Sequence, residues 1–349
     1  MKVLVTGGLG FIGSHIVGQL LDGGHEVVVV DSVEVDAHRR RPATDSRAEY
    51  HFHSVDDLDA MLDVVRGCGA VCHQAAKVGL GVDFSDVVGY VRHNDLGAAV
   101  VLRALHARGF MGRFVLASSM VVYGEGAYEC ARHGSVRPGP RDEASLAAGN
   151  FDPICPTCGH SLVPRAIPED APLVPRNVYA ATKLHQEHLA EVFASEHPGV
   201  TATALRYHNV YGPRMPRDTP YAGVASLFRS ALERGEAPRV FEDGGQRRDF
   251  VHVADVARAN VLALTGPVSV PGPLNIASGV PHTILEMAEA LADAAGPDAP
   301  GPQVVGGWRI GDVRHVVASP ERARRELGFT AAVDFASGMC ELSAAELRA

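Results

Sequence analysis

Positive charge and long apolar runs are both scarce in this chain of 349 residues. Lys and Arg together number 32 against 41 Asp and Glu, which gives a formal net charge of -9, and the lysines are only Lys2, Lys77 and Lys183. This acidic balance argues against nucleic acid or an anionic membrane as a partner. No apolar run is long enough to span a bilayer, and the first residues carry no signal-peptide pattern. We therefore expect a cytoplasmic protein without a membrane partner.

Cysteine is also sparse, with six in the chain. In a cytoplasmic protein such cysteines are expected as thiols or metal ligands rather than as disulfides. Hydrophobic residues make up 46% and charged residues 21% of the sequence, a mixture typical of globular proteins. The length is sufficient for one large domain or two coupled domains with ample core.

Short apolar segments alternate with amphipathic segments through the first 120 residues. The expected strands are 3–6, 26–31, 49–53, 70–74 and 113–118, and the expected helices are 12–23, 57–65 and 87–108. Alternation of this kind is typical of parallel βαβ units. It predicts an α/β fold with a doubly wound parallel Rossmann sheet.

A glycine-rich loop follows the first expected strand and precedes the first expected helix. Gly7, Gly10 and Gly13 would permit a tight turn, close approach of a pyrophosphate and close helix–sheet packing. Asp31 ends the second strand, where a carboxylate can bind the adenosine ribose hydroxyls and would repel a 2′-phosphate. This favours NAD over NADP, although Asp31 can also be an ordinary turn residue.

The expected strand–helix alternation breaks at residues 125–176, which are rich in Pro, Gly, Arg and Cys. A helix over 178–196 and a strand over 201–207 then follow, with further helices near 224–234, 253–264, 284–295 and 320–327. We expect an NAD-binding domain from 1–124 and 177–210, an insertion at 125–176, and a smaller C-terminal α/β part at 211–349 that mainly binds substrate.

Tyr179 and Lys183 are four residues apart within the expected helix 178–196. With 8 Tyr in 349 residues, chance places one four residues before a lysine with a probability of about 0.07. Positions i and i+4 share a helix face, so the ammonium can stabilise a phenolate and lower the tyrosine pKa. The pair therefore predicts a catalytic base, while the spacing alone also fits a surface helix with a solvated lysine.

The insertion contains two short cysteine-containing motifs, Cys130-x-x-His133 and Cys155-Pro-Thr-Cys158. Three thiolates and one imidazole form a complete tetrahedral ligand set for a structural zinc ion, which would fold a segment too polar to build its own core. Reduced free thiols and a redox-active pair of cysteines are the alternatives. We expect this segment to lie over the substrate pocket, because it connects the region of Ser119 with the helix of Tyr179.

Four motifs in one order carry a resemblance to a known family. They are the loop Gly7–Gly13, Ser119 with Tyr123-Gly124, the Tyr179/Lys183 pair, and the segment 205–213, LRYHNVYGP. Together they resemble the extended short-chain dehydrogenase/reductase family, specifically its NAD-dependent nucleotide-sugar epimerases and dehydratases. The resemblance covers nearly the whole chain outside the insertion. The sequence is most similar to 4-epimerases of the UDP-galactose type, and we expect a dTDP-linked 6-deoxyhexose of the rhamnose type as substrate.

The resemblance implies a role for each matching residue. Ser119 would hydrogen-bond the reacting sugar hydroxyl, Tyr179 would be the base, and Lys183 would bind the nicotinamide ribose and tune Tyr179. Asn94 would position this region through the backbone. The implied NAD contacts are Gly7, Gly10, Phe11, Ile12, Gly13, Asp31, Ser54, Val55, Ala75, Asn94, Tyr179 and Lys183.

The resemblance also implies a substrate site and an assembly. Asn209 would hold a phosphate of the nucleotide-diphosphate sugar, and Arg248, Arg309 and Asp312 would bind the diphosphate and the nucleoside ribose. Guanidinium groups suit phosphate oxygens, although either arginine can also be a surface ion-pair residue. A homodimer is implied, with the helices near 87–108 and 178–196 at its interface.

The chain departs from the family pattern at a few positions. Ser54 stands where an aspartate usually contacts adenine, and Asp56 or Asp57 can substitute for it. Met120 and Val121 follow Ser119 where 4,6-dehydratases carry an acid and a base, and two apolar side chains cannot eliminate water. The sequence therefore predicts C4 epimerisation through a transient 4-keto sugar. The alternatives are an NAD(P)H-dependent 4-ketosugar reductase and a catalytically inactive NAD-binding interaction protein.

Overall fold

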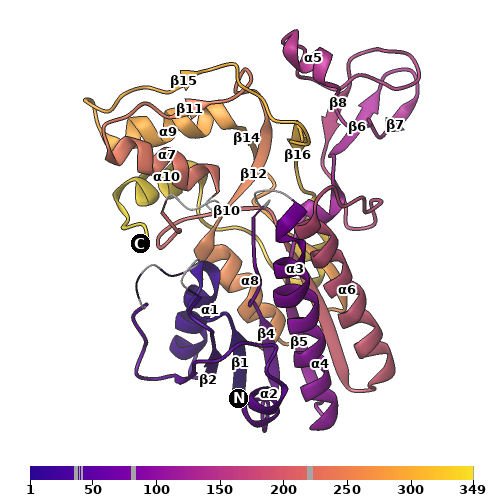
Figure 1. Cartoon of the computed structure of the whole chain (residues 1–349), viewed down its shortest axis with the longest axis vertical. Helices are drawn as coiled ribbons and strands as arrows, with labels where there is room; N and C mark the ends of the chain where they lie inside the picture. The colour runs from indigo at the N-terminus through magenta and orange to yellow at the C-terminus, as the bar shows by residue number, and fades with distance from the viewer. Residues whose placement is uncertain (35–37, 39, 41, 80–83, 218–222, 349) are drawn as a thin grey trace.

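A seven-stranded parallel sheet forms the centre of the N-terminal half (Figure 1). The computed structural model describes residues 1–34, 38, 40, 42–79, 84–217 and 223–348. The strand order is β13-β9-β5-β4-β1-β2-β3. The strands are β1 (Lys2–Thr6), β2 (Glu26–Val30), β3 (Glu49–His51), β4 (Ala70–His73), β5 (Gly112–Ser119), β9 (Val200–Tyr207) and β13 (Gly272–Ile276). Because the order reverses between β1 and β4, the carboxyl ends of these strands border the crevice where such sheets bind ligands.

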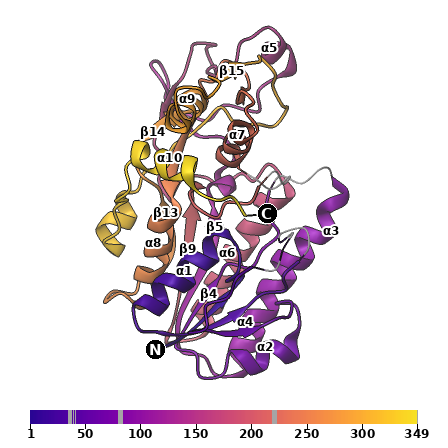
Figure 2. The same cartoon turned by 90° about the vertical axis from the view of Figure 1, so that its left-hand side faces the viewer.

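Helices cover both faces of this sheet (Figure 2). Strand β1 alternates between them: Val3 and Val5 pack toward α1 and α8, whereas Leu4 packs toward α2, α4 and α6. Alternate strand residues face opposite sides, so apolar runs are required where both faces are buried. The helices are α1 (Phe11–Asp22), α2 (Leu58–Val64), α4 (Gly97–Ala107), α6 (Val178–Glu196) and α8 (Val253–Thr265). The predicted doubly wound Rossmann fold is confirmed.

The predicted helix 87–108 is helical from Val87 to Ala107, but its turns differ. It comprises α3 (Val87–Tyr90), a π-helical segment η2 (Val91–Leu96) and α4. A short 3-10 helix, η1 (Phe84–Asp86), precedes it. Such π segments accommodate one extra residue per turn and are frequent at functional sites. Here the segment places Asn94 inside the protein, where its side chain is fully buried.

The insertion folds as a small unit that projects at the upper right of Figure 1, beside β16. Its antiparallel sheet has the order β7-β6-β8, from β6 (Ala127–Cys130), β7 (Gly134–Val136) and β8 (Val163–Arg165). A short helix, α5 (Glu143–Ala147), lies at its outer end, and the 3-10 helix η3 (Met120–Tyr123) precedes it. Its buried apolar cluster is small, being built on Tyr128, Cys130, Cys155 and Leu162.

The C-terminal part forms a second layer above the carboxyl ends of the large sheet (Figure 1). Strand β12 (Arg247–His252) pairs in parallel with β10 (Asn209–Tyr211) and β16 (His315–Val316), and antiparallel with β14 (Pro281–Thr283). The remaining elements are β11 (Arg239–Val240), β15 (Gln303–Val304), α7 (Val224–Glu233), α9 (Ile284–Ala295), η4 (Ala323–Leu327) and α10 (Phe335–Ala344). The chain after residue 211 also returns to the large sheet, to which it contributes β13 and α8.

None of the helices in the described part of the chain combines the length and the apolar character that a membrane crossing requires.

Candidate active site

A cavity of about 430 Å³ lies at the carboxyl ends of β1, β4, β5 and β9. It contains every predicted cofactor contact except Asn94. The predicted residues along its wall are Gly7, Gly10, Phe11, Ile12, Gly13, Asp31, Ser54, Val55, Ala75, Tyr179 and Lys183. Side chains that the sequence did not single out also line it, among them His38, Gln74, Lys77, Tyr207 and Arg348.

The glycine loop is too tightly packed for any other residue. A Cβ on Gly13 would lie 2.2 Å from the carbonyl oxygen of Gly7, and a Cβ on Gly7 would lie 2.7 Å from the backbone nitrogen of Ala75. Gly7 also has a φ of 65°, which favours glycine. Helix α1 begins after Gly10, and no side chain in the described part of the chain caps it. Its first N–H groups are therefore available to an anion, as a pyrophosphate requires.

Asp31 braces this loop from the end of β2. Its Oδ2 accepts from the backbone N–H of Leu9 at 3.0 Å, its Oδ1 accepts from Val33 at 2.9 Å, and His38 Nε2 lies 3.6 Å from Oδ1. Burial acts to raise the pKa of Asp31, but His38 and the two backbone donors outweigh it and lower the pKa. The carboxylate is thus ionised at neutral pH, where it repels a second anion.

Helix α6 brings Tyr179 and Lys183 to the floor of the cavity. The helix begins after Asn177, whose side chain accepts from the backbone N–H of Ala180 at 2.8 Å. Lys183 Nζ lies 5.9 Å from the centre of the Tyr179 ring and donates to the carbonyl of Ala117 at 2.9 Å. The predicted sharing of one helix face by Tyr179 and Lys183 is confirmed.

The predicted fall in the pKa of Tyr179 is wrong for this structure. Burial raises the pKa of the Tyr179 phenol, and a hydrogen bond with Ser119 opposes this rise only in part. Burial also lowers the pKa of Lys183 to about 7. The spacing reflects only the attraction between the two groups, whereas both groups are buried, and burial disfavours the charged form of each. Ser119, at the end of β5, is the hydroxyl that faces Tyr179.

Asn94 lies behind the cavity and connects its walls. Its Oδ1 accepts from the backbone N–H of Lys77 at 2.8 Å, and its Nδ2 donates to the Lys77 carbonyl at 3.0 Å and to Thr182 Oγ1 at 2.9 Å. The side chain thereby joins the loop after β4 to the residue before Lys183. Its geometry fits the expected positioning role, and its side chain does not line the cavity.

A buried ion pair that the sequence analysis missed fixes α6 against the sheet. Arg206 on β9 donates to both carboxylate oxygens of Glu187, at 3.0 and 2.7 Å, and to the hydroxyl of Tyr123 at 2.9 Å. Glu187 follows Lys183 by one helical turn, so the pair holds the rotation of α6 that points Tyr179 and Lys183 into the cavity. Arg206 in the otherwise uncharged strand β9 was the available signal, whereas Glu187 stands among other polar residues of α6.

Three of the predicted substrate residues, Arg248, Arg309 and Asp312, lie outside the lining of the cofactor cavity. Arg309 lies over the ring of Phe241, with 5.1 Å between the guanidinium carbon and the ring centre. Burial raises the pKa of Asp312, against the opposing charges of Arg309 and Arg248. Arg248 donates to the carbonyls of Val313 and Arg314 at 2.7 and 2.8 Å. The three predicted side chains are therefore brought together, with Arg248 engaged by the backbone of the same segment.

Asn209 begins β10 and precedes Val210, which lines the cofactor cavity. Its side-chain oxygen is buried without a hydrogen-bond partner among the described residues. Buried polar atoms are normally paired, so this unpaired amide oxygen is available to a hydrogen-bond donor.

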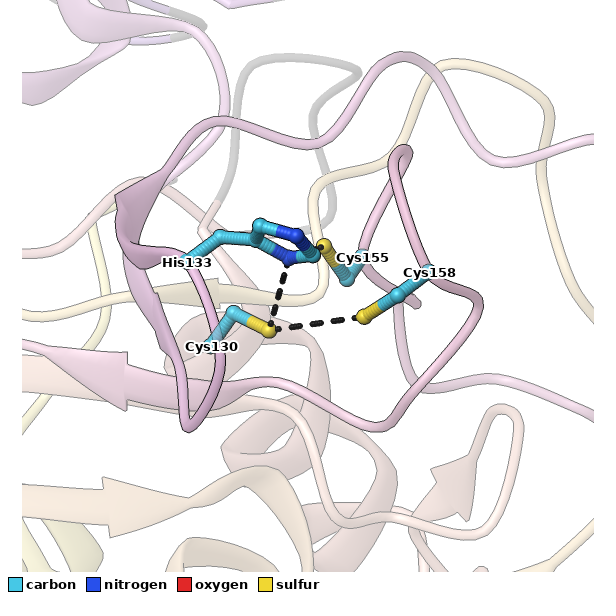
Figure 3. Close-up of side chains that lie close together, drawn as sticks. All are labelled: Cys130, His133, Cys155 and Cys158. Carbon is cyan, nitrogen blue, oxygen red and sulfur yellow. Dashed lines mark hydrogen bonds between the residues drawn. The ribbon is translucent and has the colours of Figure 1, made fainter.

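The cysteines and histidine of the insertion converge on one point (Figure 3). Their four ligand atoms all lie within 4.8 Å of one another. Cys130 Sγ is 3.6 Å from His133 Nδ1 and 3.7 Å from Cys158 Sγ, and Cys155 Sγ is 3.5 Å from His133 Nδ1. The backbone N–H of Arg132 also points at Cys130 Sγ, with a distance of 3.4 Å.

Each half of this cluster has the turn that a metal-binding knuckle requires. A glycine follows His133 and another follows Cys158, and both adopt a positive φ, 67° at Gly134 and 69° at Gly159. The backbone N–H of Gly159 donates to the carbonyl of Cys155 at 2.8 Å, which closes the turn. The positive φ lets the chain reverse directly after the second ligand, so that both side chains of each pair point inward.

The fold, the glycine loop and the Tyr179/Lys183 pair define a short-chain dehydrogenase/reductase that binds a dinucleotide. The profile of the NAD dependent epimerase/dehydratase family matches residues 3–145 and 157–277, and the chain belongs to this family. It is 35% identical to a dTDP-L-rhamnose 4-epimerase of Burkholderia thailandensis over 98% of this chain and 93% of the relative. It is 30% identical to a dTDP-glucose 4,6-dehydratase of Streptomyces niveus, over 98% and 91% of the two chains.

Solved structures are similar over the same extent. The crystal structure of a UDP-glucose 4-epimerase from Thermotoga maritima, determined with UDP-glucose, matches with a TM-score of 0.77 and 28% identity. That match covers 98% of this chain and 97% of the other. A UDP-glucose 4-epimerase from Thermus thermophilus in complex with NAD matches with a TM-score of 0.74 and 30% identity, over 98% of each chain. The suspected family relationship is thereby confirmed.

Proposed function

We propose that this chain is an NAD-dependent 4-epimerase of a nucleotide-diphosphate sugar. The observation that carries the proposal is the placement of Tyr179 and Lys183, with Ser119 beside them, in a cavity walled by the glycine loop. The 35% identity with the dTDP-L-rhamnose 4-epimerase supports a dTDP-linked 6-deoxyhexose as the substrate. Met120 and Val121, in the turn after Ser119, supply no acid or base for the elimination step of a dehydratase.

Each residue of the site has a distinct role in the proposed C4 epimerisation. Bound NAD supplies the nicotinamide ring that takes up and returns a hydride at C4. Tyr179 accepts the proton of the C4 hydroxyl and later returns it, while Ser119 hydrogen-bonds the same oxygen. Lys183 stabilises the phenolate at the moment when Tyr179 is ionised, which is worth most in a site that excludes water. The 4-keto sugar turns between the two transfers, so that its other face receives the hydride.

Turnover in the absence of added reduced cofactor tests the proposal. Untagged protein is incubated with dTDP-, UDP- and GDP-linked hexoses, and the products are followed by NMR for inversion at C4. We expect a C4 epimer without net oxidation, and NAD in the supernatant after denaturation. A strict requirement for external NADH or NADPH would instead identify a 4-ketosugar reductase. Binding of NAD without turnover of any sugar would leave the interaction-protein alternative.

We infer that Cys130, His133, Cys155 and Cys158 bind one structural zinc ion. A tetrahedral zinc with bonds of about 2.3 Å to sulfur and about 2.05 Å to nitrogen holds its ligand atoms about 3.8 Å (S···S) and about 3.6 Å (S···N) apart. The distances of 3.7, 3.6 and 3.5 Å in the cluster agree with this geometry. Three thiolates and one imidazole complete the coordination, so the ion would support structure rather than catalysis.

Metal analysis of protein purified without a histidine tag tests the zinc proposal. We expect about one equivalent per chain, as a closed four-ligand site binds one ion. Cys155→Ser should lose this zinc, whereas Cys340→Ser, at an exposed cysteine outside the cluster, should keep it. Less than a tenth of an equivalent in the unmodified chain would favour free thiols, and a disulfide between Cys155 and Cys158 would favour the redox alternative.

We further propose a homodimer through the helices that cover one face of the sheet. Several apolar side chains on these helices are exposed in the single chain: Val88 at 74%, Val91 at 44% and Val192 at 53%. Pairing of α3, η2 and α6 with their copies would bury them. Light scattering is expected to give twice the chain mass, and Val88→Glu should shift the mass toward that of a single chain.

A further inference from the structure

The backbone of segment 309–315, which carries Arg309 and Asp312, is held by hydrogen bonds to side chains. Only its end forms a strand, β16, and the residues before it are held by side chains of the insertion. The carbonyl of Asp312 accepts from Arg141 Nη2 at 2.7 Å. The backbone N–H of Arg314 donates to Glu125 Oε1 at 3.1 Å, and that of His315 donates to the Tyr128 hydroxyl at 3.2 Å.

An ionic cluster joins the insertion to this segment. Its buried members are Arg141, Glu242 and Arg314, and its partly exposed members are Asp152 and Asp243. Arg314 lies 2.7 Å from Asp152 of the insertion, 2.8 Å from Glu242 and 2.7 Å from Asp243. Arg141 of the insertion pairs with Glu242 at 2.8 Å, and the side chains of these two residues are 5% and 2% exposed. A buried ion pair is costly to break, because the partner that remains is then an unpaired buried charge.

Tyr128 connects this support to the cysteine cluster. Tyr128 and Cys130 are two residues apart on β6 and therefore face the same side of the strand. The Tyr128 ring packs in the small apolar cluster with Cys130, Cys155 and Leu162, and its hydroxyl donates to Glu125 at 3.1 Å. Within the described residues of the insertion this is the principal apolar core. The four predicted metal ligands and the side chains that bind segment 309–315 therefore belong to one small folded unit.

We propose that the metal-organised insertion is a positioning device for the nucleotide-binding segment 309–315, with Arg141 and Tyr128 as its positioning residues. Arg141 donates to the Asp312 carbonyl, and Arg248 donates to the next two carbonyls. The segment is thereby fixed in the conformation that presents Arg309 and Asp312. Loss of the metal or of Arg141 weakens binding of the nucleotide end of the substrate, and leaves the NAD cavity and the Tyr179 chemistry intact. This inference rests on the proposed function and on the proposed metal site.

Arg141→Met and Arg165→Met form a matched pair of variants for the test. Both remove a guanidinium from the insertion, but Arg165 pairs with Glu129 at the surface, at 2.6 Å, and its side chain is 57% exposed. Binding of dTDP and of UDP is measured by calorimetry, together with KM and kcat for the best sugar nucleotide. For Arg141→Met we expect Kd and KM to rise about tenfold with kcat changed less than about twofold, a coupling within the usual range between distinct sites. Arg165→Met should match the unmodified chain.

Two milder perturbations keep the test decisive if Arg141→Met does not fold. Tyr128→Phe retains the ring and removes only the hydroxyl that binds His315 and Glu125, and a chelator removes the metal without a mutation. Both should raise the Kd for the nucleotide and leave bound NAD unchanged. Equal nucleotide Kd values in the unmodified chain, the variants and the chelated protein would overturn the inference. Failure of the unmodified chain to bind either nucleotide would instead contradict the proposed function.

Discussion

The seven-stranded sheet and the insertion are held together by different kinds of interaction. In the sheet, parallel strands exchange backbone hydrogen bonds over a continuous register, for example from Gly112 to Ser119 on β5 against β9. Two apolar layers then bury both of its faces. In the insertion, strands of three or four residues surround a four-residue apolar cluster and one group of metal-binding atoms. The first region depends on many similar contacts, and the second depends on a few specific ones.

Because of this difference, we expect NAD binding and substrate binding to depend on different regions of the protein. The cofactor cavity is formed where rigid strands end, so its geometry is set by the sheet itself. The proposed nucleotide site depends on the segment 309–315, whose backbone is bonded to side chains such as Arg141 and Tyr128 and pairs with a strand only at its end, in β16. Changes in the sheet should therefore affect NAD binding and stability, whereas changes in the insertion should affect substrate affinity.

The largest effect is expected from Tyr179→Phe, which removes the proposed base without altering the cavity wall. Turnover should fall by about 1000-fold, within the range for loss of a general acid–base group. Bound NAD should remain unchanged, because the phenyl ring still fills the same space. Steady-state kinetics and the NAD released on denaturation are the two measurements. Tyr50→Phe, at a tyrosine that does not line the cavity, is the control, and residual activity near that of the control would remove Tyr179 from the mechanism.

The second largest effect is expected from a substitution in the closely packed glycine loop. Gly18, in the same helix α1 as Gly13, offers a control position. Gly13→Ala would place a Cβ 2.2 Å from the Gly7 carbonyl, whereas a Cβ on Gly18 would meet nothing within 4 Å. We expect Gly13→Ala to lower the free energy of unfolding by about 3 kcal/mol and to release NAD. Gly18→Ala should raise the free energy of unfolding by about 1 kcal/mol, because alanine is the better helix former. Urea unfolding measures both values, and equal stability of the two variants would contradict the packing argument.

A smaller effect is expected in the pH dependence of turnover. Because burial lowers the pKa of Lys183 to about 7 and raises that of Tyr179, the pair carries two protons below pH 7 and one above it. The Tyr179/Lys183 pair can accept the proton of the substrate hydroxyl only after it has released one proton of its own. Therefore kcat/KM should rise with pH through about 7 and then level off.

The variant Lys183→Arg tests whether Lys183 determines the pH at which kcat/KM rises. Arginine keeps its proton, so only Tyr179 can titrate, and the midpoint should move to higher pH by about one unit or more. Lys77→Arg changes the other lysine of the cavity wall and should leave the midpoint in place. The same midpoint in all three proteins would show that Lys183 does not determine it.

The sheet and its cofactor residues were largely predictable because they follow periodic rules. Apolar strands of four or five residues, amphipathic helices and a glycine loop between them are local patterns, and the predicted strands and helices of the first 120 residues agree with the structure to within a few residues. Strand β13 was missed because Gly272 and Pro273 stand at its start and mask an edge strand. His38 and Arg348 were missed as cavity residues because their positions depend on tertiary contacts, such as that of Arg348 Nη1 with the Leu9 carbonyl.

In the insertion, local sequence patterns predicted the cysteine cluster but not the contacts with segment 309–315. Spacing alone predicted that Cys130, His133, Cys155 and Cys158 can meet, because each pair lies in a short turn. The support of the segment 309–315 was not predictable, since Arg141 and Asp312 are 171 residues apart and bond through a side chain and a carbonyl. The direction of the shift in the pKa of Tyr179 was also not predictable from the sequence, because it depends on how deeply the phenol is buried and not on the spacing to Lys183.

The smallest expected effect is local and distinguishes the two regions directly. Chelation of the proposed zinc, or Cys155→Ser, should expose the backbone amides of β6, β7 and β8 to hydrogen exchange, because the apolar cluster around Tyr128 is too small to hold these strands alone. The amides of β1, β4 and β5 should keep their protection, since their hydrogen bonds and apolar layers do not involve the insertion. Exchange measured by mass spectrometry, with Cys340→Ser as the control, resolves the two sets. Equal loss of protection in the sheet would mean that the insertion and the Rossmann domain unfold as one cooperative unit, and the division of binding tasks between them would then fail.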